Sequence, residues 1–149
     1  EVQSKAASWY QGGTEVIFAC GGAVGNSVMA AAEASSGKVI GVDVDQSAES
    51  ATVITSAMKM LGQSVYDAIA AYYADSFPGG VSATLGADVD GVGLPMENSK
   101  FEVFTQADYD AIYAKLVAGE VSIMKDKDGD AGVKLADIPV SAVAVEEIA

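Results

Sequence analysis

Three groups of residues in this sequence have the types and spacing that could bind a small polar ligand. A glycine-rich turn, residues 21–25, follows one apolar run, and its Gly21 and Gly22 would let a ligand approach backbone N–H groups closely. Asp43 ends a second apolar run, and a carboxylate there can accept both vicinal hydroxyls of a ribose. Lys59 can donate to a hydroxyl or heterocycle, or neutralise Asp43 or Asp45.

Each of these groups also has a purely structural interpretation. The glycines can simply form a tight strand-to-helix turn, Asp43 can cap the next turn, and Lys59 can be a solvated lysine at the start of a helix. The dinucleotide fingerprint Gly-x-Gly-x-x-Gly would need a glycine where Cys20 stands. The sequence therefore indicates ligand binding at these residues without a complete cofactor motif.

The elements that must position these residues form a β-α-β unit. Residues 15–20 and 38–43 are short apolar runs that predict strands buried on both faces, with Cys20 buried and inert. Between them, residues 27–35 have a helical apolar pattern that ends with Gly37 at the C-cap. A unit of this length predicts a parallel sheet with a right-handed crossover.

Further elements are expected along the rest of the chain. They are a helix ending at Gln11, a strand at 52–55, a helix over about 58–76 with one apolar stripe, a strand at 81–85, and a helix ending at Gly119. Thr105 and Asp108 have the spacing of a capping box, which predicts where the last helix begins. Beyond Lys125 we expect an irregular tail.

Composition excludes several classes of protein. The chain has 149 residues, with 8 Lys and Arg against 21 Asp and Glu, so its net charge of −13 disfavours binding to nucleic acid or to an anionic membrane. It has no histidine, which excludes Ser-His-Asp catalysis and imidazole zinc sites. Residues 126–130 lack the glutamate and spacing of a calcium loop and predict a surface turn. We expect no catalytic residue, no metal and no cofactor.

Six motifs in a fixed order resemble one known family, the basic membrane lipoproteins. The motifs are Gln11-Gly12-Gly13, the turn 21–26, VIGVDVDQS (39–47), TSAMK (55–59), VYDAI (65–69) and DGVGL (90–94). These proteins are substrate-binding lipoproteins of ABC importers, typified by purine-nucleoside receptors. The resemblance is to the C-terminal half of the family and runs from about Trp9 to about Gly119.

The resemblance implies an α/β fold with a parallel doubly wound sheet of the type I periplasmic-binding-protein kind, incomplete because it holds parts of two lobes. Residues 1–57 would be a β-α-β portion of the C-terminal lobe, residues 58–94 a crossover helix and strand of the other lobe, and residues 95–149 a C-terminal helix and tail. It also implies that Asp43 and Lys59 hold the ribose hydroxyls of a nucleoside, with Gly21 and Gly22 lining the cleft.

The implied partners are a nucleoside-like small molecule, ABC permease subunits, and a missing N-terminal lobe or a second chain. No signal peptide or lipidation signal opens the sequence, so we expect a processed or truncated chain. The resemblance implies that the full-length form is an extracytoplasmic lipoprotein anchored to the cell membrane. Two other interpretations stay open: a nicotinamide-dependent oxidoreductase fragment, and a structural α/β domain that binds nothing.

Overall fold

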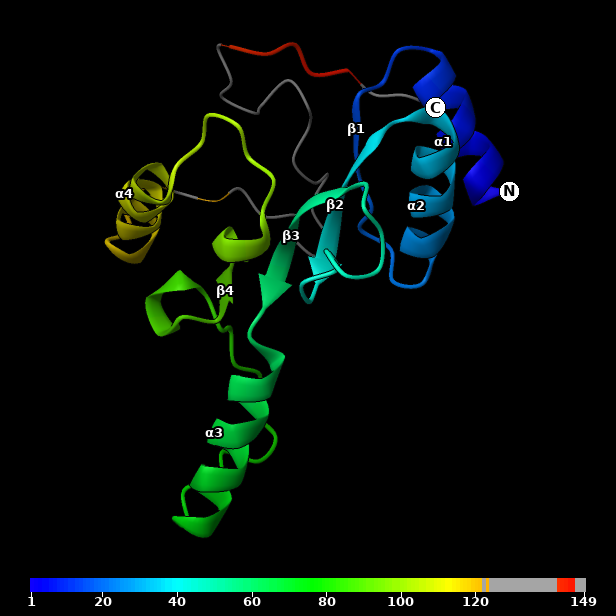
Figure 1. Cartoon of the computed structure of the whole chain (residues 1–149). Helices are drawn as coiled ribbons and strands as arrows, with labels where there is room; N and C mark the ends of the chain where they lie inside the picture. The colour runs from blue at the N-terminus through cyan, green and yellow to red at the C-terminus, as the bar shows by residue number, and fades with distance from the viewer. Residues whose placement is uncertain (122, 124–141, 147–149) are drawn as a thin grey trace.

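The structure, a computed structural model of the 149-residue chain, describes residues 1–121, 123 and 142–146. In the first half of the chain, helices and strands alternate until two strands, at 38–43 and 53–59, follow each other without a helix between them (Figure 1). The helices are α1 (Val2–Gln11), α2 (Val24–Ser35), α3 (Leu61–Tyr73) and α4 (Gln106–Val117), with 3₁₀ turns at Ala87–Val89 and Met96–Asn98. The strands are β1 (Val16–Phe18), β2 (Lys38–Asp43), β3 (Val53–Lys59) and β4 (Val92–Gly93).

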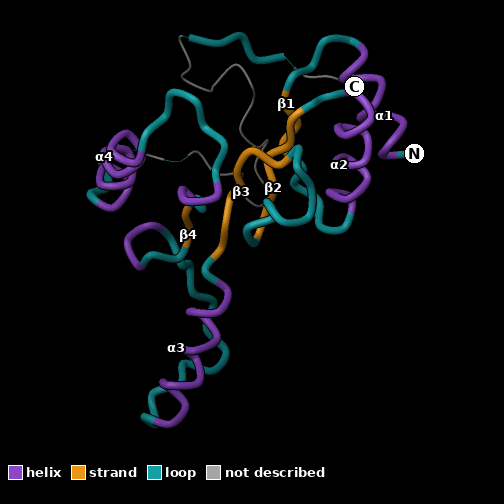
Figure 2. The backbone as a smooth tube through the Cα atoms, in the orientation of Figure 1, coloured by secondary structure: helices purple, strands orange, loops and turns teal. Residues whose placement is uncertain are grey.

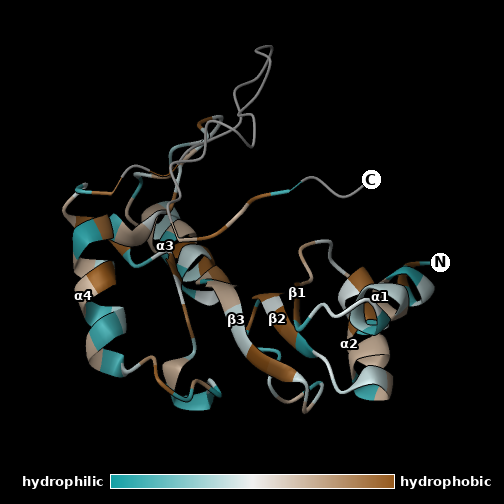
Figure 3. Ribbon diagram, turned by 90° about the horizontal axis from the view of Figure 1, so that it is seen from above, coloured by the Kyte–Doolittle hydropathy of each residue, from teal (hydrophilic) through white to brown (hydrophobic). Residues whose placement is uncertain are grey.

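The four strands form one sheet in the order β1-β2-β3-β4 (Figure 2). The pairs β1–β2 and β2–β3 are parallel, and only β3–β4 is antiparallel. Helices α1 and α2 lie at the β1–β2 end of the sheet, and α4 lies beyond β4 at the opposite end (Figures 1 and 3). The predicted α/β class, with a mostly parallel sheet and a β1-α2-β2 unit, is confirmed.

The core lies between the helix pair and the sheet. Figure 3 shows that much of β2 and β3 consists of hydrophobic residues, drawn in brown. The two central strands contribute Val39 and Val53, both fully buried, and α2 contributes Val28 and Ala32 on the face that its apolar spacing predicts. Burial of these aliphatic side chains is the main force that holds α2 against the sheet.

The end of α2 differs from the prediction at Gly37. Ser36, with φ of 56°, takes the left-handed position at the end of the helix, and Gly37 follows it. A Cβ on Gly37 would lie 2.2 Å from a ring carbon of Tyr10, whose hydroxyl donates to Lys38 O at 2.8 Å. Gly37 is therefore required for the close approach of the Tyr10 ring rather than for helix termination.

Replacing Gly37 tests this interpretation. Gly37→Ala is expected to destabilise the fold by about 1–3 kcal/mol, because the ring of Tyr10 has to move to admit the new methyl group. Urea unfolding measures the effect. Gly62→Ala is the control, since its Cβ would meet nothing within 4 Å, and a cost for Gly37→Ala no larger than for Gly62→Ala would contradict the account.

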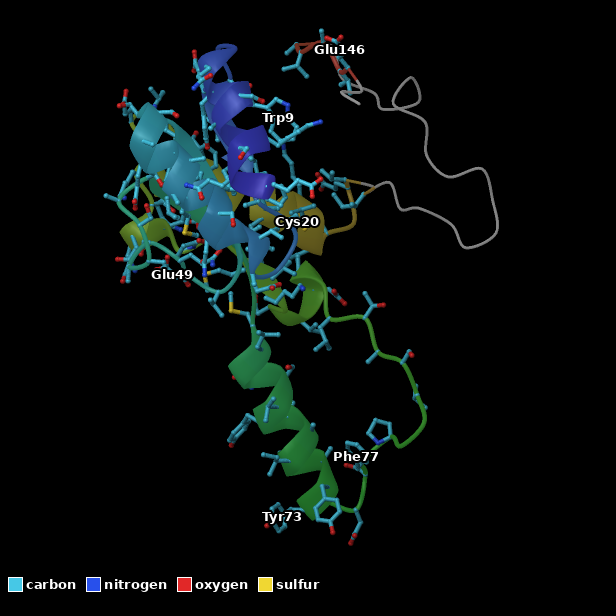
Figure 4. All side chains as sticks on the ribbon, turned by 90° about the vertical axis from the view of Figure 1, so that its right-hand side faces the viewer. Trp9, Cys20, Glu49, Tyr73, Phe77 and Glu146 are labelled. Atoms are coloured by element: carbon cyan, nitrogen blue, oxygen red, sulfur yellow. The ribbon has the colours of Figure 1, made fainter. Side chains whose placement is uncertain are left out.

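Helix α3 extends away from the rest of the molecule (Figure 1). No residue of α3 is buried, and its predicted apolar stripe, which includes Val65 and Ile69, is exposed to solvent. Tyr73 and Phe77 lie at its far end (Figure 4). A helix of this length gains little stability by itself, so the stripe is typical of a face that packs against another polypeptide.

Several boundaries differ from the predicted ones. Residues 81–85 form no strand, because β-propensity makes a strand only where another strand pairs with it, and none does in the described part of the chain. Strand β1 is open on one side, with Val16 and Phe18 exposed, since it lies at the edge of the described sheet. Residues 126–130 and most of the predicted tail lie outside the described residues.

The strand predicted at 52–55 extends to Lys59 as β3, and the helix begins only at Leu61. Pairing decides this, because Met58 and Lys59 are hydrogen-bonded to β4, which lies more than thirty residues further along the chain. Strand β3 therefore crosses the proposed boundary between residues 57 and 58. The division into 1–57, 58–94 and 95–149 stays a prediction.

Candidate ligand-binding site

The carboxyl ends of β1, β2 and β3 lie at one edge of the sheet because these strands are parallel. Asp43 is the last residue of β2, and Lys59 is the last residue of β3. Their side chains form an ion pair, with 2.6 Å between Lys59 Nζ and Asp43 Oδ1. The sequence left Asp43 and Asp45 open as ion-pair partners of Lys59, and in the structure the partner is Asp43.

The loop after β2 holds Asp43 in an unusual backbone conformation. Its φ is +71°, in the left-handed region that Asp and Asn tolerate better than most residues. Just before it, the Val42 N–H donates to Gln46 Oε1 at 2.9 Å, and the Gln46 N–H donates to Ser56 Oγ at 3.0 Å. These bonds fold the loop back across Gly41, where a Cβ would lie 2.6 Å from Ser56 Oγ.

Gln46 and Ser56 were not predicted as parts of the site. Both lie inside the two most specific motifs, residues 39–47 and 55–59. The motifs therefore marked these residues but did not indicate that their side chains hold the loop. Ser56 is fully buried on β3, and its hydroxyl joins β3 to the loop that carries Asp43. The two motifs are thus linked by hydrogen bonds as well as by strand pairing.

The ion pair is accessible to a ligand. The Lys59 side chain is 61% exposed and that of Asp43 is 41% exposed, although Asp43 Oδ1 itself is shielded from solvent. The hydrogen bond and charge of Asp43 raise the pKa of Lys59, with a smaller contribution from Cys20. An exposed pair of this kind contributes little to stability, so its carboxylate and ammonium are free to exchange partners with ligand hydroxyls.

Asp45 is occupied elsewhere. Its carboxylate accepts from the Ser47 N–H at 3.0 Å and from Asn98 Nδ2 at 2.8 Å. The backbone hydrogen bond from Ser47 is the largest cause of its lowered pKa. Asp45 therefore tethers the loop after β2 to the segment after β4 instead of facing Lys59.

The glycine turn follows β1 at the same edge of the sheet. Gly21 and Gly22 are exposed, Gly22 has φ of +64°, and a Cβ on Gly21 would lie 2.6 Å from Val24 Cγ2. Helix α2 begins at Val24 without a side-chain cap. Of the four predicted residues, Asp43 and Lys59 end the neighbouring strands β2 and β3 and are in contact, while Gly21 and Gly22 lie in the turn after β1 at the same edge of the sheet.

The prediction that Cys20 is buried is wrong. Cys20 is exposed, because β1 ends at Phe18 and Cys20 lies beyond the end of the strand. The native chain is therefore expected to react with a disulfide reagent within a small factor of the rate of the chain unfolded in urea. Protection of more than about a hundredfold, as for a thiol that reacts only on unfolding, would contradict this placement.

None of the helices in the described part of the chain has both the length and the apolar character that a membrane span needs. Within residues 1–121, 123 and 142–146, no three Cys, Asp or Glu side chains are grouped so that they could hold a metal ion.

Residues 2–127 match the sequence profile of the Bmp family, described as PnrA-like ABC transporter substrate-binding proteins. The chain belongs to this family. Two curated relatives, the CD4+ T-cell-stimulating antigens of Listeria monocytogenes and Listeria innocua, are each 31% identical to it over 138 residues. The match covers 81% of this chain, which spans only 39% of the length of either relative.

Solved structures support the fold of this Bmp family chain. An ABC transporter solute-binding protein of Aeropyrum pernix K1 matches with a TM-score of 0.63 and 22% identity, over 86% of this chain and 45% of that one. One from Conexibacter woesei matches with a TM-score of 0.58 and 24% identity, over 81% and 41%. The expected periplasmic-binding-protein-like α/β fold, present only in part, is therefore confirmed.

Proposed function

We propose that this chain forms part of the solute-binding site of an ABC importer's receptor, and that the solute is a nucleoside. The observation that carries the proposal is the exposed Asp43–Lys59 pair at the carboxyl edge of the sheet. Open α/β sheets bind ligands at this edge. Membership of a substrate-binding family favours a binding role over catalysis.

The chemistry of the pair suits a ribose. The carboxylate of Asp43 accepts from two vicinal hydroxyls, while the ammonium of Lys59 donates to one of their oxygens, so each group keeps a charged hydrogen bond after the ligand arrives. Gly21 and Gly22, in the turn after β1 at the same edge of the sheet, are exposed and carry no side chain that would hinder the approach of the sugar to the backbone. No step of bond making or breaking is involved.

The nucleoside would be enclosed when a second lobe closes on it, as in a hinged trap that binding stabilises in its closed state. We place α3, within residues 58–94, in that other lobe, where its exposed apolar stripe would pack against the rest of the lobe. The rest of the lobe would come from polypeptide corresponding to the unmatched part of the relatives, or from a second chain. The receptor would work outside the cytoplasmic membrane as a lipoprotein and deliver its ligand to permease subunits.

Calorimetry with a panel of ligands tests the proposal. A ribonucleoside is expected to bind, and its 2′-deoxy and 2′,3′-dideoxy forms to bind at least about tenfold more weakly, because each lost hydroxyl leaves a charged group without its partner. NADH is included to test the oxidoreductase alternative. Equal affinity for the three nucleosides, or tight binding of NADH alone, would refute the proposal.

A further inference from the structure

Gln46 lies in the loop after β2, and each of its four polar atoms has a hydrogen-bond partner. Its Oε1 accepts from the Val42 N–H at 2.9 Å, and its own N–H donates to Ser56 Oγ at 3.0 Å. Its Nε2 donates to Glu49 Oε2 at 3.1 Å, and its C=O accepts from the Glu49 N–H at 3.0 Å. Gly41 leaves room for this arrangement, since a Cβ there would lie 2.8 Å from Gln46 Oε1. A residue bonded in this way is held rigidly in the loop.

The bond to Val42 takes the place of a strand that has already ended. On the β1 side of β2, the Ile40 C=O accepts from the Ala19 N–H. Alternate residues of a strand point their backbone groups to the same side, so the Val42 N–H also points toward β1, which ends at Phe18. Gln46 Oε1 gives this N–H an acceptor where the strand does not continue.

The backbone next to this bond is strained at Asp43. The Val44 N–H donates to Val42 O at 2.9 Å across Asp43, whose φ is +71°. A hydrogen bond over three residues around such a φ is the pattern of the rare, strained form of the γ-turn. A conformation of this kind persists only where surrounding contacts impose it. Gln46 supplies such contacts, because it binds Val42 at the start of the turn while Ser56 on β3 fixes Gln46 itself.

We propose that Gln46 is a positioning residue for Asp43, which imposes the turn that directs the Asp43 carboxylate to Lys59 and does not itself touch the ligand. The inference rests on the proposed function, because it gives Gln46 a role in binding only through Asp43. Without Gln46 the turn would relax, and the carboxylate would leave its position 2.6 Å from Lys59 Nζ.

Competitive acetylation tests the position of Asp43 without any ligand. Acetic anhydride reacts with uncharged amines, so its rate at Lys59, relative to the exposed Lys115 on α4, reports how strongly Asp43 favours the charged form of Lys59. Gln46→Met keeps the length of the side chain but offers the backbone no comparable acceptor. It is expected to raise the relative rate about two- to fivefold, as Asp43→Asn does, in the range of an exposed ion pair.

Calorimetry with adenosine tests the role of Gln46 in binding. Gln46→Met is expected to weaken adenosine binding about tenfold in the native background, but less than about twofold in Asp43→Asn, because Gln46 acts through that carboxylate. A residue that only stabilised the fold would have the same effect in both backgrounds. Melting temperatures check folding, and if Gln46→Met does not fold, Gln46→Asn, which is too short to reach the Val42 N–H, takes its place.

Two further variants serve as the rescue and the control. The exchange variant, Gln46→Glu with Glu49→Gln, keeps the net charge, an acceptor for the Val42 N–H and a hydrogen bond between the two side chains, so it should label and bind as the native chain does. Gln106→Met on α4 is the matched control. It also loses an exposed hydrogen bond to a carboxylate, that of Asp110, and should change neither measurement.

Native labelling of Lys59 in Gln46→Met, an equal loss of affinity in both backgrounds, or a folded exchange variant that binds no better than Gln46→Met would overturn this inference alone, if Asp43→Asn still impairs binding. Absence of adenosine binding by the native chain, or binding that ignores Asp43→Asn, would overturn the proposed function and this inference with it.

Discussion

Asp43→Asn is expected to weaken binding of a ribonucleoside by about 1.5–3 kcal/mol, which is roughly 10- to 150-fold in the dissociation constant. The change removes the charge that makes the hydrogen bonds to the vicinal hydroxyls strong, while it keeps the size of the side chain. Asn is also tolerated at the left-handed φ of +71° found at Asp43, so the backbone should not change. Titration calorimetry measures the effect.

Asp75→Asn is the matched control for this substitution. Asp75 follows the end of α3, also has a left-handed φ, 53°, and lies outside the proposed site. It is expected to bind the nucleoside as the native chain does. Native affinity in Asp43→Asn, or the same loss in both variants, would remove Asp43 from the site.

Tyr10→Ala is expected to reduce the free energy of unfolding by about 3–5 kcal/mol, as for other large aromatic side chains removed from a core. Tyr10 is buried against α2 and the sheet, its ring fills the space beside Gly37, and its hydroxyl donates to Lys38 O. Tyr10→Phe keeps the ring and should cost only about 0.5–1.5 kcal/mol for the lost hydrogen bond. Urea unfolding of both variants distinguishes packing from hydrogen bonding, and equal losses would contradict the account.

The same residue predicts a dependence of stability on pH. Burial raises the pKa of the Tyr10 phenol above its ordinary value of 10.0, because the charged phenolate is disfavoured inside the fold. Stability from this term is present below the unfolded pKa and is lost as the pH rises through the folded pKa. Tyr10→Phe should therefore lose less stability than the native chain above about pH 10, and parallel curves for the two would contradict this.

The parts of the fold that depend on local pattern were predicted well. Residues 38–43 form β2 as expected, because the apolar residues 39–42 stand between Lys38 and Asp43 and are bounded by Gly37 and a polar loop. The capping box at Thr105 and Asp108 is present, with each residue satisfying a backbone N–H of the other. Such signals are contained in a few neighbouring residues and need no tertiary partner.

The parts that depend on distant partners were predicted poorly. The extension of β3 to Lys59 depends on β4, and the absence of a strand at 81–85 depends on which strands are available to pair. The exposure of Cys20 and Phe18 depends on β1 lying at the edge of the described sheet. A local sequence pattern does not indicate which strand, if any, pairs with a given strand.

The candidate site shows the same division. Asp43 was placed correctly at the end of a strand, but Lys59 was assigned to the start of a helix. Its position at the end of β3 brings its ammonium within 2.6 Å of the Asp43 carboxylate. Because Lys59 was placed in a helix, the geometry of this ion pair could not be predicted from the sequence. The roles of Gln46 and Ser56 were also hidden, because their hydrogen bonds join segments ten residues apart.

A crystal structure of the chain with a bound ribonucleoside tests the central claim most directly. We expect the two vicinal ribose hydroxyls to lie about 2.5–3.0 Å from the carboxylate of Asp43, with the ammonium of Lys59 donating to one of the same oxygens. A nucleoside whose ribose contacts neither side chain, with the 2.6 Å ion pair unchanged, would show that the sugar is recognised elsewhere.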